Sequence, residues 1–292
     1  MVAVAVIREN FMNKIKENLM KYVFLLTACI SIISVLLICI FLFGTGIPTI
    51  NKIGVFEFLF GREWRPSNDV YGIFPMIISS IYVTAGAIIV GVPIGLLCAS
   101  FMAFFCPKPL YKIIKPAVNL LAGIPSIVYG FFGLVVIVPI IQNLFKTSGK
   151  GLLTASLLLG IMILPTIINV TESSLKAVPT NYYEGSLALG ATHERSVFSV
   201  VFPAAKSGVF AGVILGIGRA IGETMAVMMI AGNQPVIATK LTSGIRTLTA
   251  NIALEMGYAT GLHKQALIAT AVVLFTFILI INISFSLLKK KG

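Results

Sequence analysis

Arg219 and Glu223 are the charged residues of an apolar stretch that covers residues 207–232. On a helix, side chains four residues apart are neighbours, so this spacing predicts that the two can pair. An arginine at the middle of a bilayer costs roughly 2.5–3.5 kcal/mol on insertion scales, and a neighbouring carboxylate offsets only part of that cost. Charged residues kept in such a place are therefore candidates for function.

The chemistry that suits this pair is weak binding of an oxyanion. The planar fork of donors on Arg219 matches the oxygens of a phosphate or a carboxylate. A passing anion could replace Glu223 as the partner of the guanidinium, in a site weak enough for the cargo to leave. The alternative interpretation is a structural salt bridge between subunits.

Ser126 and Tyr129 are further candidates for a pathway, because they lie in an apolar stretch interrupted by Gly123, Pro125 and Gly130. Broken helices are tolerated in lipid only where protein or a cavity surrounds them. The sequence favours a pathway lining and a simple Gly/Pro packing site equally.

Patterns for catalysis or cofactor binding are absent from the sequence. The two histidines, His193 and His263, are far apart, and none of the four cysteines forms a CxxC pair. No Walker motif occurs, so ATP binding through a P-loop is excluded. We expect no catalytic residue, no metal site and no cofactor on this chain.

The composition identifies the elements that must position these residues. Only 11% of the 292 residues are charged and 58% are hydrophobic, whereas soluble domains carry about 25% charged residues. This excludes an ordinary cytosolic enzyme, a disordered chain and a disulfide-rich secreted scaffold. The basic residues are scattered among short loops, which argues against nucleic acid as the partner of the +12 net charge.

The chain is therefore predicted to be an all-α, polytopic protein of the cell membrane. Long apolar runs in lipid must be helices, and the alternating ten-residue strands of a β-barrel are absent. We predict a segment at 1–21 and one six-span membrane domain at 22–292. The six apolar stretches cover residues 22–43, 73–105, 117–145, 151–171, 207–232 and 266–288.

The orientation follows from the lysines and arginines. If the N-terminus is cytoplasmic, 13 of them lie in inner segments and 8 in outer loops, with Arg219 inside a span. Basic residues concentrate on the cytoplasmic side of membrane proteins. Both termini and the segment 1–21 are thus predicted to be cytoplasmic. The two long outer loops cover about 44–72 and 233–264, and are expected to have a function or to form a re-entrant or interfacial cap.

The largest inner loop, at about 172–206, predicts a short helix. Pro179 stops the preceding span, Thr180 or Asn181 could cap a new helix, and Gly190 would end it or permit a sharp turn. Such a helix, held along the membrane surface, forms a rigid knob on which a motor subunit could push.

Small residues recur every fourth position at the start of the fifth stretch. Gly208, Gly212 and Gly216 therefore share one helix face, which allows another helix to approach closely. We interpret this face as a packing surface.

The inner loop resembles a motif of a known family. It reads Glu184-Gly185-Ser186, three residues, Gly190, nine residues, then Val200-Val201-Phe202-Pro203. ABC importer permeases carry E-A-A, three residues, Gly, nine residues, then I-x-L-P, in a loop that sits in a groove of the ATPase. The spacing and the Glu, Gly and Pro all match, whereas Gly-Ser, Val and Phe replace Ala-Ala, Ile and Leu. The resemblance implies that Glu184–Gly190 is a coupling helix; the alternative is an ordinary interfacial helix.

Three further stretches resemble the PstC-type permeases of phosphate importers. They are Gly218-Arg219-Ala220-Ile221-Gly222-Glu223-Thr224-Met225-Ala226-Val227, Gly123-Ile124-Pro125-Ser126-Ile127-Val128-Tyr129-Gly130, and Gly61-Arg62-Glu63-Trp64-Arg65-Pro66. The last favours PstC over PstA. A shorter Arg-Ala-x-Gly-Glu core also occurs in sulfate and molybdate permeases. The resemblance covers nearly the whole chain from about residue 20.

This resemblance implies the type I ABC importer permease fold and import of inorganic phosphate by alternating access. The implied partners are a PstA-like permease in a heterodimer, two copies of an ATPase that uses ATP and Mg²⁺, and an extracytoplasmic phosphate-binding protein. The rivals are a permease for sulfate, molybdate or tungstate, and an ion-coupled secondary transporter. The latter is disfavoured because Glu223 is the one carboxylate clearly deep in a span. A membrane-embedded enzyme lacks a catalytic cluster.

Overall fold

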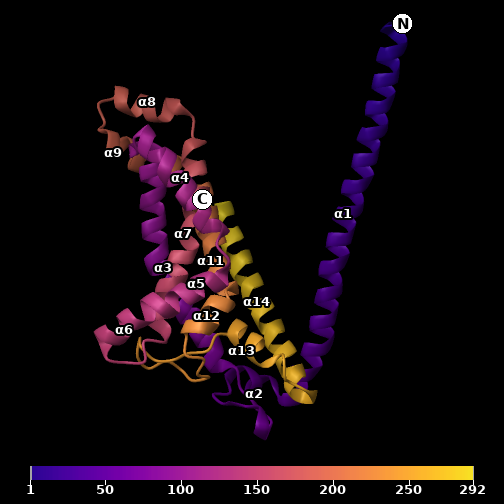
Figure 1. The fold of residues 1–292 in the computed structure, drawn as a ribbon, viewed down its shortest axis with the longest axis vertical. Coiled ribbons are helices and arrows are strands. Elements are labelled where there is room, and N and C mark those ends of the chain that lie inside the picture. Colours follow the sequence, from indigo (N-terminus) through magenta and orange to yellow (C-terminus); the bar gives the residue numbers. More distant parts are fainter. Residues whose placement is uncertain (1, 292) are drawn as a thin grey trace.

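A computed structural model describes the backbone of residues 2–291 and the side chains of residues 16–284. Helices make up nearly all of it, and the long ones run between two ends of the molecule (Figure 1). The loop helices α8 (Thr180–Ala188) and α9 (His193–Ser196) form one end, called here the α8 end. Helices α2 (Val55–Phe60) and α13 (Leu248–Glu255) lie at the other, the α13 end.

The chain is an all-α, multi-pass membrane protein. Within the described residues, five helices are long and apolar enough to cross a bilayer, and a bent pair, at 76°, makes a sixth if it counts as one span. Four of the five lie in the long helices α1 (Val2–Ile53), α3 (Phe74–Ser100), α7 (Leu152–Lys176) and α14 (Gly261–Lys291), and the remaining one is Ser126–Phe145. Helix α11 (Lys206–Gly222) is the second member of the bent pair. Helix α1 continues without a break through residue 21, where the sequence suggested the end of a separate segment.

Helix α7 is the centre of the bundle, and α3 packs along it. Glycines bring the two backbones close: a Cβ added to Gly91 in α3 would lie 2.8 Å from the carbonyl oxygen of Gly160 in α7. Membrane helices associate mainly through such close packing, because lipid tails are as apolar as the side chains they would replace. The α7 side chains in this layer, such as Leu158 and Ile163, are fully buried.

Helix α11 packs on another face of α7 through its small residues. Cβ atoms added to Gly208, Gly212 and Gly216 would meet, in turn, the side chains of Ser174, Thr171 and Ile167. The three glycines therefore set the spacing between the two helices.

The third apolar stretch, predicted over 117–145 with an interruption near Pro125, is broken there, and only Ser126–Phe145 is long and apolar enough to span. It comprises the end of α4 (Lys108–Gly123), α5 (Ser126–Phe132), a π-helical turn η3 (Gly133–Ile137) and α6 (Val138–Phe145). Ile124 and Pro125 are extended at the break, with ψ of 126° and 140°. The cause is Pro125, which lacks an N–H and disfavours helical geometry at the residue before it.

The fifth stretch is also broken, whereas the sequence predicted a continuous span over 207–232. Helix α11 ends at Gly222, Glu223 is extended (φ −71°, ψ 128°), and α12 (Met225–Ile230) follows. Discontinuous helices near the middle of a bilayer often mark a cavity or a binding site.

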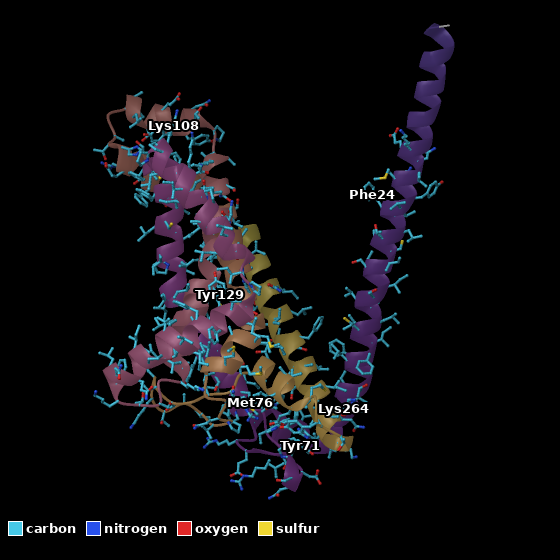
Figure 2. All side chains as sticks on the ribbon, in the orientation of Figure 1. Phe24, Tyr71, Met76, Lys108, Tyr129 and Lys264 are labelled. Atoms are coloured by element: carbon cyan, nitrogen blue, oxygen red, sulfur yellow. The ribbon has the colours of Figure 1, made fainter. Side chains whose placement is uncertain are left out.

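Helix α1 diverges from the bundle toward the α8 end (Figure 1). It touches α14 near the α13 end, where the rings of Phe43 and Phe275 lie 5.8 Å apart. Farther along, its apolar side chains are exposed; Phe24, which Figure 2 labels on this part, is one of them.

The first outer loop folds into a small cap at the α13 end. It contains α2 and a two-stranded antiparallel ribbon, β1 (Trp64–Arg65) and β2 (Val70–Tyr71), joined by a 3-10 turn, η1 (Pro66–Asn68). Figure 2 shows Tyr71 and Lys264 at this end, Lys108 at the α8 end and Tyr129 between them. Lys108 and Lys264, predicted for opposite sides of the membrane, thus lie at opposite ends of the molecule.

The glycine packing generates a matched test. A Cβ at Gly216 would lie 2.9 Å from Cγ1 of Ile167, whereas one at Gly218 meets nothing within 4 Å. Gly216→Val is expected to lower the free energy of unfolding by about 1–3 kcal/mol through overpacking. Gly218→Val carries the same helix-propensity change without the clash. Thermal unfolding of the purified subunit in detergent compares them, and equal midpoints would contradict the packing role.

Candidate functional site

Arg219 lies in the last turn of α11, where the partial negative charge of the helix C-terminus favours a cation. Its side chain is partly buried, and Nη1 donates a hydrogen bond to Oγ1 of Thr166 in α7 (3.3 Å). Thr166 was missed by sequence reasoning, because nothing local links it to a residue 53 positions away.

Arg219 and Glu223 are not paired among the described side chains, so that prediction is wrong. The break after Gly222 removes the four-residue helical relation between them. Oε1 of Glu223 instead accepts a hydrogen bond from the backbone N–H of Ala226 (3.2 Å), in the first turn of α12. A carboxylate there caps a helix N-terminus, where negative charge is stabilising. The carbonyl of Glu223 accepts a further bond from Thr249 (3.0 Å).

Tyr129 braces the break in the third stretch. Its hydroxyl donates to the carbonyl of Leu121 (2.8 Å), in the last turn of α4, and its ring is buried in the same core as Ala220. The structure therefore brings Tyr129 to the level of Arg219. Ser126 opens α5 and is partly buried.

Close packing joins the two broken segments. A Cβ added to Gly130 in α5 would lie 2.9 Å from Cα of Ala226 in α12. The two short helices thus lie side by side, and Ala226 is the residue whose N–H binds Glu223. Gly130 belonged to a motif noted in the sequence, but its partner in α12 could not be inferred.

One face of α11 next to Arg219 is open. Cβ atoms added to Gly218 or Gly222 would meet nothing within 4 Å, unlike those on the face toward α7. Residues four apart share a helix face. The guanidinium therefore sits on a helix end beside space that this chain leaves free.

The inner loop contains the predicted short helix, α8, and the chain turns at Gly190 just after it. Gly190 adopts φ +85°, which favours glycine, and its N–H donates to Leu187 (2.9 Å) while that of Ala191 donates to Ser186 (3.2 Å). These two bonds form a Schellman motif. The helix begins at Thr180 with Pro179 at the N-cap position, so neither Thr180 nor Asn181 caps it.

The outward surface of α8 is free of contacts from the chain itself. Glu184 and Gly185 are exposed, and Leu189 is 91% exposed. Ser186, which stands where the family motif has Ala, accepts a hydrogen bond from the hydroxyl of Ser196 (3.0 Å) and so ties α8 to α9.

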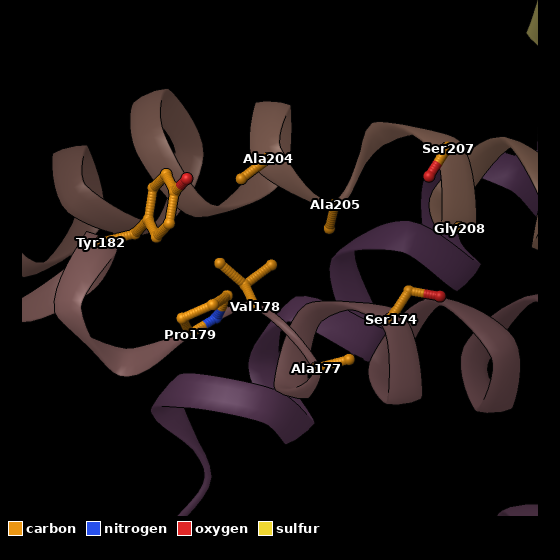
Figure 3. A pocket seen from close by; sticks show the side chains of 9 residues that line it. All are labelled: Ser174, Ala177, Val178, Pro179, Tyr182, Ala204, Ala205, Ser207 and Gly208. Carbon is orange, nitrogen blue, oxygen red and sulfur yellow. The ribbon is translucent and has the colours of Figure 1, made fainter. Parts of the chain in front are cut away.

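The chain bends sharply after α9, by 76° between His193–Ala204 and Lys206–Gly222. Pro203 is the second residue of α10 (Phe202–Ala204), and α11 starts after a turn at Ala205. An open pocket of about 380 Å³ lies between this bend, the end of α7 and Tyr182 of α8 (Figure 3). Val178 and Pro179 border it in Figure 3, and they belong to the short link that joins α7 to α8.

A buried carboxylate holds the α8 ends of α4 and α7 together. Glu172 is 2% exposed and receives bonds from Lys176 (2.7 Å), Lys115 (2.7 Å) and the hydroxyl of Tyr111 (2.6 Å). Lys176 lies one helical turn beyond Glu172 in α7, so this pair depends on local spacing alone. Lys115 and Tyr111, more than 50 positions away, gave no signal in the sequence.

A second buried carboxylate organises the α13 end. Glu255 accepts bonds from Nε1 of Trp64 (2.8 Å) and from Arg246 (2.5 Å), and lies 2.8 Å from Nε2 of His263. The Trp64 that marked the first outer loop is thus an anchor for the cap. Nearby, burial and the bond to Asp69 raise the pKa of Tyr71 to about 12, so this phenol stays protonated at physiological pH.

Within residues 16–284, His, Cys, Asp and Glu side chains do not gather in groups that could hold a metal ion. The titratable clusters described above are occupied by their own hydrogen bonds and ion pairs.

Residues 91–291 match the family described as "Binding-protein-dependent transport system inner membrane component". The chain is 38% identical to a probable ABC transporter permease, YqgH, of Bacillus subtilis, over 88% of each chain. It is 35% identical to the phosphate transport system permease protein PstC of Mesorhizobium japonicum, over 84% of this chain and 81% of that one. The chain therefore belongs to the binding-protein-dependent transport permeases, and within them to the PstC type.

Solved structures agree on the fold. The MetNI methionine ABC transporter, in an inward facing conformation, has a TM-score of 0.59 at 22% identity, covering 78% of this chain and 99% of that one. An amino acid ABC transporter gives 0.54 at 17% identity, over 75% and 92%. The predicted ABC importer permease fold is thereby confirmed. Membership of this family makes the chain a transport subunit that works with an ATPase and a binding protein.

The Glu172 cluster predicts a measurable contribution to stability. Glu172→Gln removes the charge that binds two lysines, and hydrogen bonds to charged groups contribute about 1.5–3 kcal/mol. We expect a loss of about 2 kcal/mol in the free energy of unfolding. Glu57→Gln, at an exposed position of α2, is the control. Denaturation in mixed micelles measures the free energy of unfolding of both variants. Equal values for the two would contradict a stabilising role of the Glu172 cluster.

Proposed function

We propose that this chain is the permease subunit that passes inorganic phosphate into the cytoplasm, with Arg219 as the cation past which the anion moves. The observation that carries the proposal is the placement of Arg219: a guanidinium on a helix end, hydrogen-bonded to the neutral Thr166 and bordered by an open helix face. A cation in that setting favours an anionic partner from outside the chain.

The cargo is inferred from relatives. Several similar permeases are named for phosphate transport, including PstC of Pasteurella multocida, 35% identical over 75% of each chain. An arginine also suits this cargo, because its planar fork can bind two phosphate oxygens and stays charged when desolvated. Glu223, which caps α12, keeps the broken helix in place beside the pathway. Ser126 and Tyr129 are proposed to line it.

Transport would proceed by alternating access. The exposed surface of α8, with Glu184 and Gly185, is proposed to dock in the ATPase, and Ser186, Gly190 and Pro203 keep the loop in shape. ATPase closure would move α8 and rock the helices, so that the pathway opens alternately to each side. No covalent chemistry is assigned to this chain.

The proposed assembly is a heterodimer with a PstA-like permease, two ATPase copies and an extracytoplasmic phosphate-binding protein. The N-terminal part of α1 lies toward the α8 end, which supports a cytoplasmic N-terminus if α8 meets the ATPase (Figure 1). The α13 end, with its Trp64 cap, would then face the binding protein. We retain the division into a short segment at 1–21 and one membrane domain.

The function is tested by reconstituting the four components in proteoliposomes and measuring uptake of labelled phosphate. Wild type is expected to accumulate phosphate only with ATP. Arg219→Leu is expected to lower the uptake rate about 10- to 100-fold, which corresponds to the loss of one hydrogen bond to a charged group. Arg219→Lys keeps the charge and is expected to lower the rate by a smaller factor. Excess sulfate or molybdate should not compete. Normal uptake by an assembled Arg219→Leu complex, or uptake driven by an ion gradient without ATP, would contradict the proposal.

The coupling helix has its own test. Gly190→Pro removes the N–H that bonds Leu187 and imposes a φ near −65° where the chain needs +85°. We expect the ATPase to detach or to hydrolyse ATP without transport. Gly44→Ala, at an open and exposed position of α1 away from the loop, should keep both activities. The measurements are copurification of the ATPase with the complex and its rate of ATP hydrolysis during transport. A Gly190→Pro complex that retains the ATPase and transports like wild type would count against coupling through α8.

A further inference from the structure

The coupling helix has few side chains through which to pass a movement inward. Within α8, Tyr183 and Ser186 are partly buried and the other residues are exposed. Ser186 bonds to Ser196 and so stays inside the loop. Tyr183 packs against a buried cluster of membrane-helix residues, among them Leu175 of α7 and Val209 of α11.

Tyr183 meets the end of α3 through a group of rings. The chain beyond α3 forms a π-helical turn, η2 (Phe101–Phe105), and the ring of Phe104 lies 5.7 Å from that of Tyr183. The next residue, Phe105, lies 4.4 Å from the imidazole of His193, edge to face. A hydrogen bond of 2.5 Å joins the Tyr183 hydroxyl to Nδ1 of His193. Paired aromatic rings in these geometries contribute about 0.5–1.5 kcal/mol beyond their burial.

These four residues form a contact between segments that the chain links only indirectly. Phe104 and Phe105 belong to the second span, whereas Tyr183 and His193 belong to the loop between the fourth and fifth. Loop-internal bonds keep α8 folded independently of this contact, through Gly190 and Ser186. Removing the contact should therefore leave α8 and α3 folded but no longer in contact through these rings.

Helix α3 offers a rigid continuation toward the pathway. It packs tightly on α7 along its length, and its residues Val83 and Ala87 lie in the same buried core as Tyr129 and Ala220. A displacement at η2 is therefore delivered to the layer that holds Arg219. A π-helical turn at the point of contact is in keeping with this, because such turns are frequent at functional sites.

We propose that Phe104, Phe105, Tyr183 and His193 form an aromatic joint that carries the movement of the coupling helix into α3. The inference rests on the proposed function, because it takes α8 as the element that the ATPase moves. The four residues are positioning residues: they touch neither cargo nor nucleotide. Their contribution is to keep ATP hydrolysis tied to transport.

The test measures ATP hydrolysed per phosphate imported in proteoliposomes that contain the complete transporter. Tyr183→Phe removes the hydroxyl bond to His193, and Phe105→Ala removes the ring against His193. Tyr82→Phe and Phe101→Ala are matched controls, since both are exposed side chains of the second span outside the joint. Coupling between sites typically corresponds to at least about a fivefold effect, so we expect the ratio to rise about fivefold in Phe105→Ala and less in Tyr183→Phe.

The controls should keep the wild-type ratio. An unchanged ratio in assembled Tyr183→Phe and Phe105→Ala complexes would overturn the joint. So would loss of assembly in Phe105→Ala together with an unchanged ratio in Tyr183→Phe, because the contact would then be purely structural. Failure of the proposed function is distinguishable, since it would show as absence of ATP-dependent phosphate uptake by the wild-type complex.

Discussion

The fold must accommodate a charged guanidinium, that of Arg219, inside an apolar span. Arg219 sits on a helix end within an apolar span, and the described part of the chain gives it a hydroxyl partner, Thr166, rather than a carboxylate. A guanidinium has five donors, and in an apolar setting each unsatisfied donor is costly. Under the proposed function, a transported anion would supply acceptors for these donors transiently.

The fold around this residue combines rigid and interrupted helices. Helices α3, α7 and α11 pack closely through glycines, which leaves little freedom between them. The segments next to Arg219 are broken at Pro125 and Glu223, and each break is held by a specific bond, from Tyr129 and to Ala226. A rigid bundle can move as a unit, while short helices beside it can change the access to the pathway.

The sequence predicted the membrane class, the interruption at Pro125 and the glycine ending α8, because each depends on composition or local spacing. It failed at the second break, after Gly222. An apolar run does not reveal that Glu223 prefers to cap α12 over remaining in α11, since that choice depends on Thr249 and Ala226. The partners of Arg219, Glu172 and Glu255 are distant in sequence, and only the packed fold brings them together.

The most direct measurement is the solvent access of the open face beside Arg219. In an assembled transporter in which Cys29, Cys39, Cys98 and Cys106 are replaced, Gly222→Cys would be treated with a charged, water-soluble thiol reagent. The account predicts labelling in at least one nucleotide state and protection by phosphate. A thiol that remains unreactive in every nucleotide state would show that no aqueous route passes Arg219, and would contradict it.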